Sequence, residues 1–405
     1  MFRPLQDRNF LLLWLGQLCS QSGDRLTQMV LVALVTTRSS GSALSLAAVM
    51  AITSLPALLV NPFAGVYVDR WDRKRTMIFC DLIRAGTIAG FPWLMTHAGG
   101  IPFYMGVFIV FAVAGFFVPA RLAMIPDLVP AKSLAQANAL FTSSGMIGSA
   151  VVLLIGALVV EWIGAVRSCW INAAAYMVSA AVILPIVRPK RPRVHRSASV
   201  KLISTEMVEG VQELWKHPDT RRIAGLLGIL TAGAGASLVV GTVLVQKTLH
   251  SVTKDLGFLS LWMGIGMLTG SLAYSRWGTR RSRPIILGTS FLGCAVAIWL
   301  FIAGVIGLKS GMAASLAVWF LGFWIAPVGI VANILVHEGH AGQLHGRIFS
   351  SLGVVVNVAF ISSMLLAGWL VERGGRGLLL GAIGAGFALS GLRLLCYTGK
   401  KERFP

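Results

Sequence analysis

The sequence predicts an all-α membrane protein in which twelve transmembrane helices form two pseudo-symmetric six-helix bundles. Hydrophobic residues make up 56% of the 405-residue chain and charged residues only 12%, whereas soluble domains carry about 25% charged residues. Twelve apolar stretches approach or exceed the ~20 residues that a spanning helix needs. A short basic motif also occurs twice, half a chain apart, as expected of a duplicated helical half.

The predicted spans fall into two groups of six on either side of one long polar segment. Residues 1–187 form the predicted N-terminal bundle, 188–222 the cytoplasmic linker and 223–405 the C-terminal bundle. Within the linker, a short amphipathic surface helix is predicted over Ser199–Lys216. The predicted spans are 10–36, 43–68, 76–96, 103–121, 135–160, 166–187, 223–247, 256–275, 284–306, 311–335, 348–371 and 377–396.

The repeated motif is the main evidence for the duplication. Its copies are Gly65–Arg75 (GVYVDRWDRKR) and Gly270–Arg281 (GSLAYSRWGTRR), with their Arg-Trp pairs 206 residues apart. A second repeat, Phe141–Gly145 (FTSSG) and Phe349–Gly353 (FSSLG), has an offset of 208 residues. Two such halves facing each other in a bilayer are typical of secondary transporters.

The net charge of +20 raises the question of nucleic-acid binding, but the positions of the basic residues argue against such a partner. They lie in short segments between apolar stretches and not on one soluble face. With the N-terminus in the cytoplasm, 26 of the 35 Lys and Arg residues fall on the cytoplasmic side and 7 on the other. This asymmetry predicts a multi-pass membrane protein with both termini and the central loop in the cytoplasm.

No cofactor or metal site is expected. The five cysteines stand singly, without the CxxC spacing of metal cages. His337, Glu338, His340 and His345 gather in one loop, but His-Glu-x-His is not the His-Glu-x-x-His spacing of a zinc site. No nucleophile–base pair or phosphate-binding loop is present either, so the sequence does not predict an enzyme.

The first copy of the basic motif resembles the loop between helices 2 and 3 of the major facilitator superfamily, whose pattern is Gly-x-x-x-Asp-Arg-x-Gly-Arg-Lys/Arg. The matching residues are Gly65, Asp69, Arg70, Arg73 and Lys74. Asp72 stands where that family has Gly, and Ser275 takes the position of Asp69 in the second copy. The resemblance covers the whole chain and implies the major facilitator fold.

Further segments resemble one branch of this superfamily, which contains macrolide-type drug exporters and the enterobactin exporter. These segments are Gly23-Asp24, Asp81–Ala85, Pro119–Arg121, Ala137–Ala139 and Gly346–Phe349. The resemblance implies a secondary active transporter that exports small amphipathic organic compounds. A siderophore exporter and a lysophospholipid flippase stay open, because the lysophospholipid transporter has a similar Gly-Asp pair in helix 1.

A polar stripe on the first span predicts a cavity for substrate and proton. Gln17, Gln21, Asp24 and Gln28 recur at i, i+4, i+7 and i+11, which places them on one helix face. A charge at the centre of a span costs ~2.5–3.5 kcal/mol on insertion scales, so Asp24 is expected to face a cavity or a partner. The alternative is that Asp24 only ties this helix to another one and fixes their packing.

Two further residues are predicted to line this cavity. Arg25 lies about 100° around the helix from Asp24 and is a candidate to bind an anionic substrate group. Asn357, in the eleventh span, occupies the repeat position of Ser149.

The resemblance also implies a cytoplasmic gate built from charged residues. Asp69 is expected to meet the N-terminus of the eleventh span near Arg347, where the helix dipole favours negative charge. Asp81 and Arg84, three residues apart on the third span, are expected to pair and to belong to the same cluster. The full predicted gate is Gly65, Asp69, Arg70, Arg73, Asp81, Arg84 and Arg347.

The leading hypothesis is therefore a monomeric, proton-coupled exporter that works by alternating access, with Asp24 as proton acceptor. The fifth span weakens its antiport part, because Gly145, Gly148 and Gly156 occur there without the proline of the antiporter segment. A hypothesis of a different class is a membrane receptor or scaffold that transports nothing.

Overall fold

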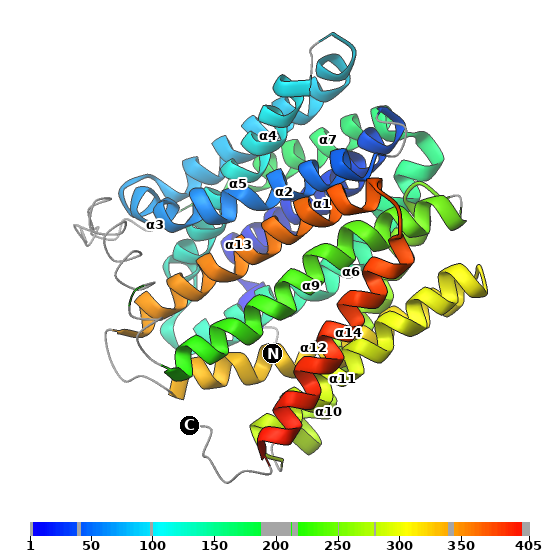
Figure 1. Cartoon of the computed structure of the whole chain (residues 1–405). Coiled ribbons are helices and arrows are strands. Elements are labelled where there is room, and N and C mark those ends of the chain that lie inside the picture. The colour runs from blue at the N-terminus through cyan, green and yellow to red at the C-terminus, as the bar shows by residue number, and fades with distance from the viewer. Residues whose placement is uncertain are drawn as a thin grey trace. The chain divides into compact units, whose positions relative to one another are not determined.

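The computed structural model is helical throughout the spans it describes (Figure 1). The described residues are 3–38, 42–97, 100–187, 212, 218–249, 251–278, 281–338 and 344–398, and no strand occurs among them. Ten helices are long and apolar enough to cross a membrane, and α2 with α3 adds one bent span. The polar stripe makes α1 less apolar, yet its 31 residues reach about 46 Å at ~1.5 Å per residue.

The helices coincide one for one with the twelve predicted spans, α2 and α3 together filling the second, so the predicted all-α membrane fold is confirmed. In the first half of the chain they are α1 (Arg8–Arg38), α2 (Ala43–Leu59), α3 (Asn61–Arg70), α4 (Arg73–His97), α5 (Gly100–Leu128), α6 (Leu134–Ile163) and α7 (Ala165–Ile183). In the second half they are α9 (Pro218–Leu249), α10 (Lys254–Trp277), α11 (Arg283–Ile302), α12 (Gly311–Glu338), α13 (Leu344–Glu372) and α14 (Arg376–Thr398).

The second span is broken at Val60, where α2 and α3 meet at an angle of 51°. Pro62 lies in the first turn of α3. A proline ring has no N–H and clashes with the carbonyl four residues earlier, so it fits best in the first turn of a helix. Pro62 is therefore well placed to begin α3, whereas Pro56 in α2 and Pro92 in α4 lie inside their helices.

The chain divides into two compact units. Unit 1 comprises 1–34 and 52–204, and unit 2 comprises 35–51 and 205–405. Residues 35–51, at the end of α1 and the start of α2, thus group with the second half of the chain. The predicted domain limits at 187 and 223 stay a prediction, and the predicted surface helix at Ser199–Lys216 lies outside the described residues except for Gln212.

In unit 1, two glycines let α1 approach α7 closely. A Cβ atom at Gly16 would lie 2.7 Å from Ile183, and one at Gly23 would lie 2.7 Å from the Tyr176 ring. Small residues at helix contacts are a general device of membrane proteins, because lipid offers no hydrophobic driving force between helices. This approach brings the polar side chains of α1 and α7 within hydrogen-bonding distance of each other.

Unit 2 uses the same device. In the contact of α10 with α12, a Cβ atom at Gly266 would lie 2.1 Å from the Trp319 carbonyl oxygen. The start of α2 packs in this unit as well, where the fully buried Ala47 contacts a small apolar cluster with Val239 and Met364. Close backbone approach therefore fixes the helix contacts in both units.

Candidate functional site

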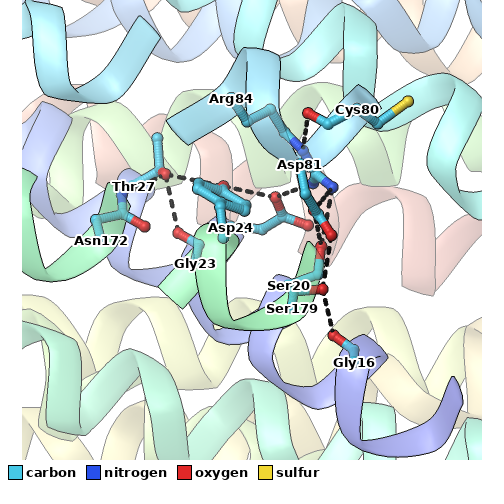
Figure 2. Close-up of polar contacts among 11 residues, drawn as sticks. Gly16, Ser20, Gly23, Asp24, Thr27, Cys80, Asp81, Arg84, Asn172 and Ser179 are labelled. Atoms are coloured by element: carbon cyan, nitrogen blue, oxygen red, sulfur yellow. Dashed lines mark hydrogen bonds and ion pairs between the residues drawn. The ribbon is translucent and has the colours of Figure 1, made fainter. Parts of the chain in front are cut away.

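The most strongly charged part of the membrane-spanning region of unit 1 is a cluster around Arg84 (Figure 2). The Arg84 side chain has no exposed surface. Its Nη1 donates to Asp24 Oδ1 at 2.8 Å, and its Nη2 donates to Ser20 Oγ at 2.9 Å and to Asp81 Oδ1. One guanidinium thereby joins α1 to α4, which are separated in the sequence by α2 and α3. A buried cation of this kind is stable only where carboxylates and further hydrogen bonds surround it.

Aromatic rings enclose the same guanidinium. Its central carbon lies 4.8 Å from the centroid of Phe117 on α5 and 4.6 Å from that of Tyr176 on α7. Cations are attracted to the electron-rich ring face, most strongly where water is excluded. Arg84 therefore contacts side chains from α1, α5 and α7 as well as its own helix.

Asp81 is completely satisfied within the protein. Its side chain is fully buried. Oδ1 accepts from Arg84 and from Ser20 Oγ at 3.0 Å, and Oδ2 lies 2.6 Å from Ser179 Oγ. The Ser179 hydroxyl also lies 2.8 Å from the Gly16 carbonyl and can donate to only one of these oxygens at a time. With both oxygens engaged, Asp81 holds Arg84 in place and offers no free atom to a ligand.

Asp24 differs from Asp81 in this respect. Its Oδ1 accepts from both Arg84 and the Tyr176 hydroxyl, each at 2.8 Å. Its Oδ2 makes no hydrogen bond to any described residue, and 33% of the side chain is exposed. Asp24 thus combines a firmly held oxygen with an accessible one.

A polar extension leads from Tyr176 along the α1–α7 contact. The Tyr176 hydroxyl lies 3.2 Å from Thr27 Oγ1, and the amide of Asn172 lies 2.7 Å from the same atom. Thr27 can also donate to the Gly23 carbonyl at 2.9 Å. This extension keeps the tyrosine ring and its hydroxyl in one orientation toward Asp24.

The predicted α1 stripe does not act as a single surface. Gln21 donates to the Gly145 carbonyl at 3.2 Å and to Ser149 Oγ at 3.0 Å, so it contacts α6, whereas Asp24 contacts α4 and α7. Gln17 is buried, and the Oε1 atoms of Gln17 and Gln21 have no partner among the described residues.

The other two predicted residues of α1 contact each other. Arg25 Nη1 donates to Gln28 Oε1 at 3.3 Å. In unit 2, Asn357 donates to the Gly353 carbonyl of its own helix at 2.8 Å. The cavity roles of these residues stay predictions.

In the described contacts the predicted gate residues fall into separate groups, and the gate itself stays a prediction. Asp81 and Arg84 pair as their spacing suggests, but they join Asp24 and not the basic motif. Arg73 instead binds Asp127 at 2.8 Å and the Ala123 carbonyl at 2.7 Å, which ties the start of α4 to the end of α5. The reason is distance, because Asp81 stands two helical turns above Arg73 on the same helix.

The remaining gate residues are placed as follows. Gly65, Asp69 and Arg70 lie in α3. Arg347 is in the first turn of α13, and its side chain, like those of His337, Glu338 and His345, falls outside the described part. His340 is not described, and no group of metal-binding side chains occurs in the portion that is. The contact of Asp69 with this end of α13 stays a prediction.

Sequence reasoning missed Ser20, Thr27, Asn172, Tyr176 and Ser179. A signal for them was present, because Asn172, Tyr176 and Ser179 recur at i, i+4 and i+7 in an otherwise apolar helix. Ser20, Asp24 and Thr27 follow the same spacing on α1.

Comparisons with known proteins identify the family. The sequence profile of the Major Facilitator Superfamily matches residues 13–362. The multidrug efflux pump Tap of Mycolicibacterium fortuitum is 26% identical over 377 residues, which cover 90% of each chain. Macrolide efflux protein A of Streptococcus pyogenes is 25% identical over 403 residues, 96% of this chain and 93% of the relative. The crystal structure of the nucleoside transporter NupG has the same fold, with a TM-score of 0.77 at 14% identity, covering 98% of this chain and 100% of that one. The chain therefore belongs to the Major Facilitator Superfamily and is a multi-pass membrane transporter.

Proposed function

We propose that this transporter exports small amphipathic organic compounds from the bacterial cytoplasm by alternating access, and that proton binding at Asp24 drives the cycle. The observation that carries the proposal is the free, accessible Oδ2 of Asp24 within a membrane-spanning region. An ionisable residue inside a membrane normally marks a substrate or proton pathway. Its partners Arg84 and Tyr176 bind only Oδ1, so they orient the carboxylate without covering it.

The charge of the cluster favours a cation at this position. Asp24, Asp81 and Arg84 together hold two carboxylates and one guanidinium, a net charge of −1 when all three are ionised. Binding of one proton or one cationic substrate group at Asp24 makes the set neutral. Exchange of a proton for a substrate at one carboxylate is a direct means of coupling their movements.

The direction and substrate class rest on the relatives. Tap is named a multidrug efflux pump, and the second relative is named a macrolide efflux protein. Both alignments cover at least 90% of this chain. The distribution of basic residues supports cytoplasmic termini in the inner membrane. In the proposed cycle a proton from outside binds Asp24, the units rock, the proton leaves to the cytoplasm, and substrate takes its place. We propose that the chain acts as a monomer and catalyses no chemical reaction.

The cytoplasmic end of the pathway is proposed to close through the basic motif. Arg73 and Asp127 keep the start of α4 and the end of α5 together. That pair supports a rigid base for α3, from which Asp69 would bind the dipole at the start of α13.

Inverted membrane vesicles energised with a proton gradient test the proposal. Ethidium, erythromycin and a fluorescent lysophospholipid are the substrates, and wild type is compared with Asp24→Asn and with Asp255→Asn. Asp255 is a matched control because it is a carboxylate in the first turn of α10, outside the cluster.

The expected result is gradient-dependent uptake of ethidium or erythromycin that Asp24→Asn abolishes and Asp255→Asn preserves. Uptake of the lysophospholipid alone, unaffected by the gradient, would overturn the proposal in favour of a lipid flippase. No transport of any of the three by well-folded protein would favour a receptor or scaffold.

A further inference from the structure

The arginine of α5, Arg121, has no ionic partner among the residues that the structure describes. Arg121 on α5 is partly buried, and its guanidinium makes no hydrogen bond or ion pair with any residue that the structure describes. Its Nε is completely buried without an acceptor. Its one described contact is with the Phe141 ring of α6, whose centroid lies 5.6 Å from the guanidinium carbon. A charge left without a counterion in a membrane span is costly, which points to an anion that is present only part of the time.

The neighbourhood of Arg121 includes Asp24, whose carboxylate keeps one oxygen without a described partner. Arg121 lies one helical turn after Phe117 on α5, and the Phe117 ring contacts the Arg84 guanidinium that binds Asp24. Asp81 is bound to Arg84, and Arg25 donates to the neutral side chain of Gln28. Arg121 and the Asp24 oxygen without a described partner are therefore linked through Phe117 and Arg84 and do not contact each other.

We infer that Arg121 binds the anionic group of the transported compound while Asp24 binds its cationic group, so that the preferred substrates are amphipathic zwitterions. This inference rests on the proposed export function and narrows its substrate class. A guanidinium suits a carboxylate or phosphate because its planar donors match two oxygens at once. The Phe141 ring beside Arg121 offers an apolar surface next to the charge. A compound with only a cation would meet Asp24 but would be repelled by Arg121.

A matched probe series separates the two charges. Biphenylalanine is an amphipathic zwitterion, its methyl ester keeps only the cation, and its N-acetyl form keeps only the anion. Binding of each is measured by isothermal titration calorimetry on the purified full-length protein in lipid nanodiscs. The variants are Arg121→Gln, Arg121→Lys and Asp24→Asn, with Arg167→Gln, an exposed arginine on α7, as the control.

Wild type is expected to bind the zwitterion at least ~10-fold more tightly than either singly charged form, as charge-assisted contacts of this kind imply. In Arg121→Gln the zwitterion should bind no more tightly than the ester, and the affinity for the ester should not fall. Arg121→Lys should retain part of the preference for the zwitterion over the ester. Asp24→Asn should weaken the zwitterion and the ester alike, and Arg167→Gln should change nothing. Melting temperatures show whether each variant is folded.

Two results overturn the inference. One is a wild type that binds the three forms equally or none of them, a measurement that needs no variant. The other is a folded Arg121→Gln protein that keeps the preference for the zwitterion. The export proposal survives either result if vesicles still accumulate ethidium or erythromycin. Failure of this inference can therefore be told apart from failure of the export proposal.

A zwitterionic lipid head group carries the same pair of charges as biphenylalanine. A fourth probe therefore tests whether a lysolipid binds at this site. Lysophosphatidylethanolamine that displaces biphenylalanine from wild type and not from Arg121→Gln supports the charge pair and assigns it to a lysolipid. Displacement independent of Arg121 places the lysolipid elsewhere and counts against a shared site.

Discussion

Asp24 and Asp81 share one guanidinium: Arg84 binds Asp24 through Nη1 and Asp81 through Nη2. The two carboxylates differ in what remains available, because Asp81 is fully buried and saturated whereas Asp24 keeps a free oxygen. One arginine thus connects the buried Asp81 to Asp24, for which we propose a role in transport. A change in the charge of Asp24 therefore alters the electrostatic surroundings of Arg84, which bonds α1 to α4 and stacks on rings of α5 and α7.

Replacing Arg84 should destabilise the protein by more than the hydrogen bonds of Arg84 contribute, because a buried acid loses its counterion. Arg84→Gln leaves Asp81 buried without a counterion, and removing one partner of a buried pair costs about 3–5 kcal/mol. Adding Asp81→Asn removes the stranded charge and should recover part of the stability. Thermal melting in detergent, followed by size-exclusion chromatography, measures both effects. Strictly additive losses in the double variant would contradict the pairing.

Gly23→Ala should loosen the contact between α1 and α7. The added methyl group would lie 2.7 Å from the Tyr176 ring, whose hydroxyl holds Asp24. Overpacking of this kind costs about 1–3 kcal/mol, so the melting temperature and the transport rate should both fall.

Gly86→Ala on α4 is the matched control for that substitution. A Cβ atom there meets nothing within 4 Å, and alanine is favoured over glycine in a helix by up to about 1 kcal/mol. Its melting temperature should stay the same or rise. Equal losses at Gly23 and Gly86 would show that the close contact with Tyr176 is not what Gly23 provides.

The helices could be predicted from the sequence because each needs only local information. A run of about 20 apolar residues predicts a span whichever helix it packs against. The bend at Val60 coincides with Pro62 in the first turn of α3, but a proline alone does not predict a bend here, because Pro56 and Pro92 lie inside helices. The pairing of Asp81 with Arg84 is equally local, as three residues on one helix place side chains side by side.

The partner of Asp24 could not be predicted in this way. Helical periodicity shows that Asp24 shares a face with Gln21, but the side chains that meet that face come from Arg84 and Tyr176, 60 and 152 residues away. The prediction that Arg84 belongs to the gate came from the family resemblance. Its true surroundings depend on the rotation of α4 about its axis, which packing against α5 and α7 decides.

Charge exchange should test the tie between α4 and α5. The Arg73 and Asp127 side chains are 28% and 12% exposed, so each single reversal, Arg73→Asp or Asp127→Arg, places like charges together. The double reversal restores opposite charges and should regain part of the loss, on the order of 1 kcal/mol for a partly exposed pair. It regains only part, because the bond to the Ala123 carbonyl is not restored. Melting temperatures of the four proteins provide the measurement, and a double variant no better than the worse single one would argue against the pair.

Gly368→Leu should open the contact between α13 and the start of α2 in unit 2. A Cβ atom at Gly368 would lie 2.5 Å from that of Ala47 and 3.0 Å from the Ala43 carbonyl, so leucine cannot fit without separating the helices. Ala47 is fully buried, and a cysteine placed there reports the separation. In an Ala47→Cys protein whose exposed Cys396 is replaced by serine, labelling by a water-soluble maleimide should increase several-fold with Gly368→Leu. Gly353→Leu on the same helix, where a Cβ meets nothing within 4 Å, is the control and should leave labelling unchanged. Because alternating access requires helix contacts to form and separate in turn, a side chain that keeps α2 and α13 apart should also slow transport. Labelling that stays low with Gly368→Leu in a folded protein would show that α2 and α13 can repack around the larger side chain.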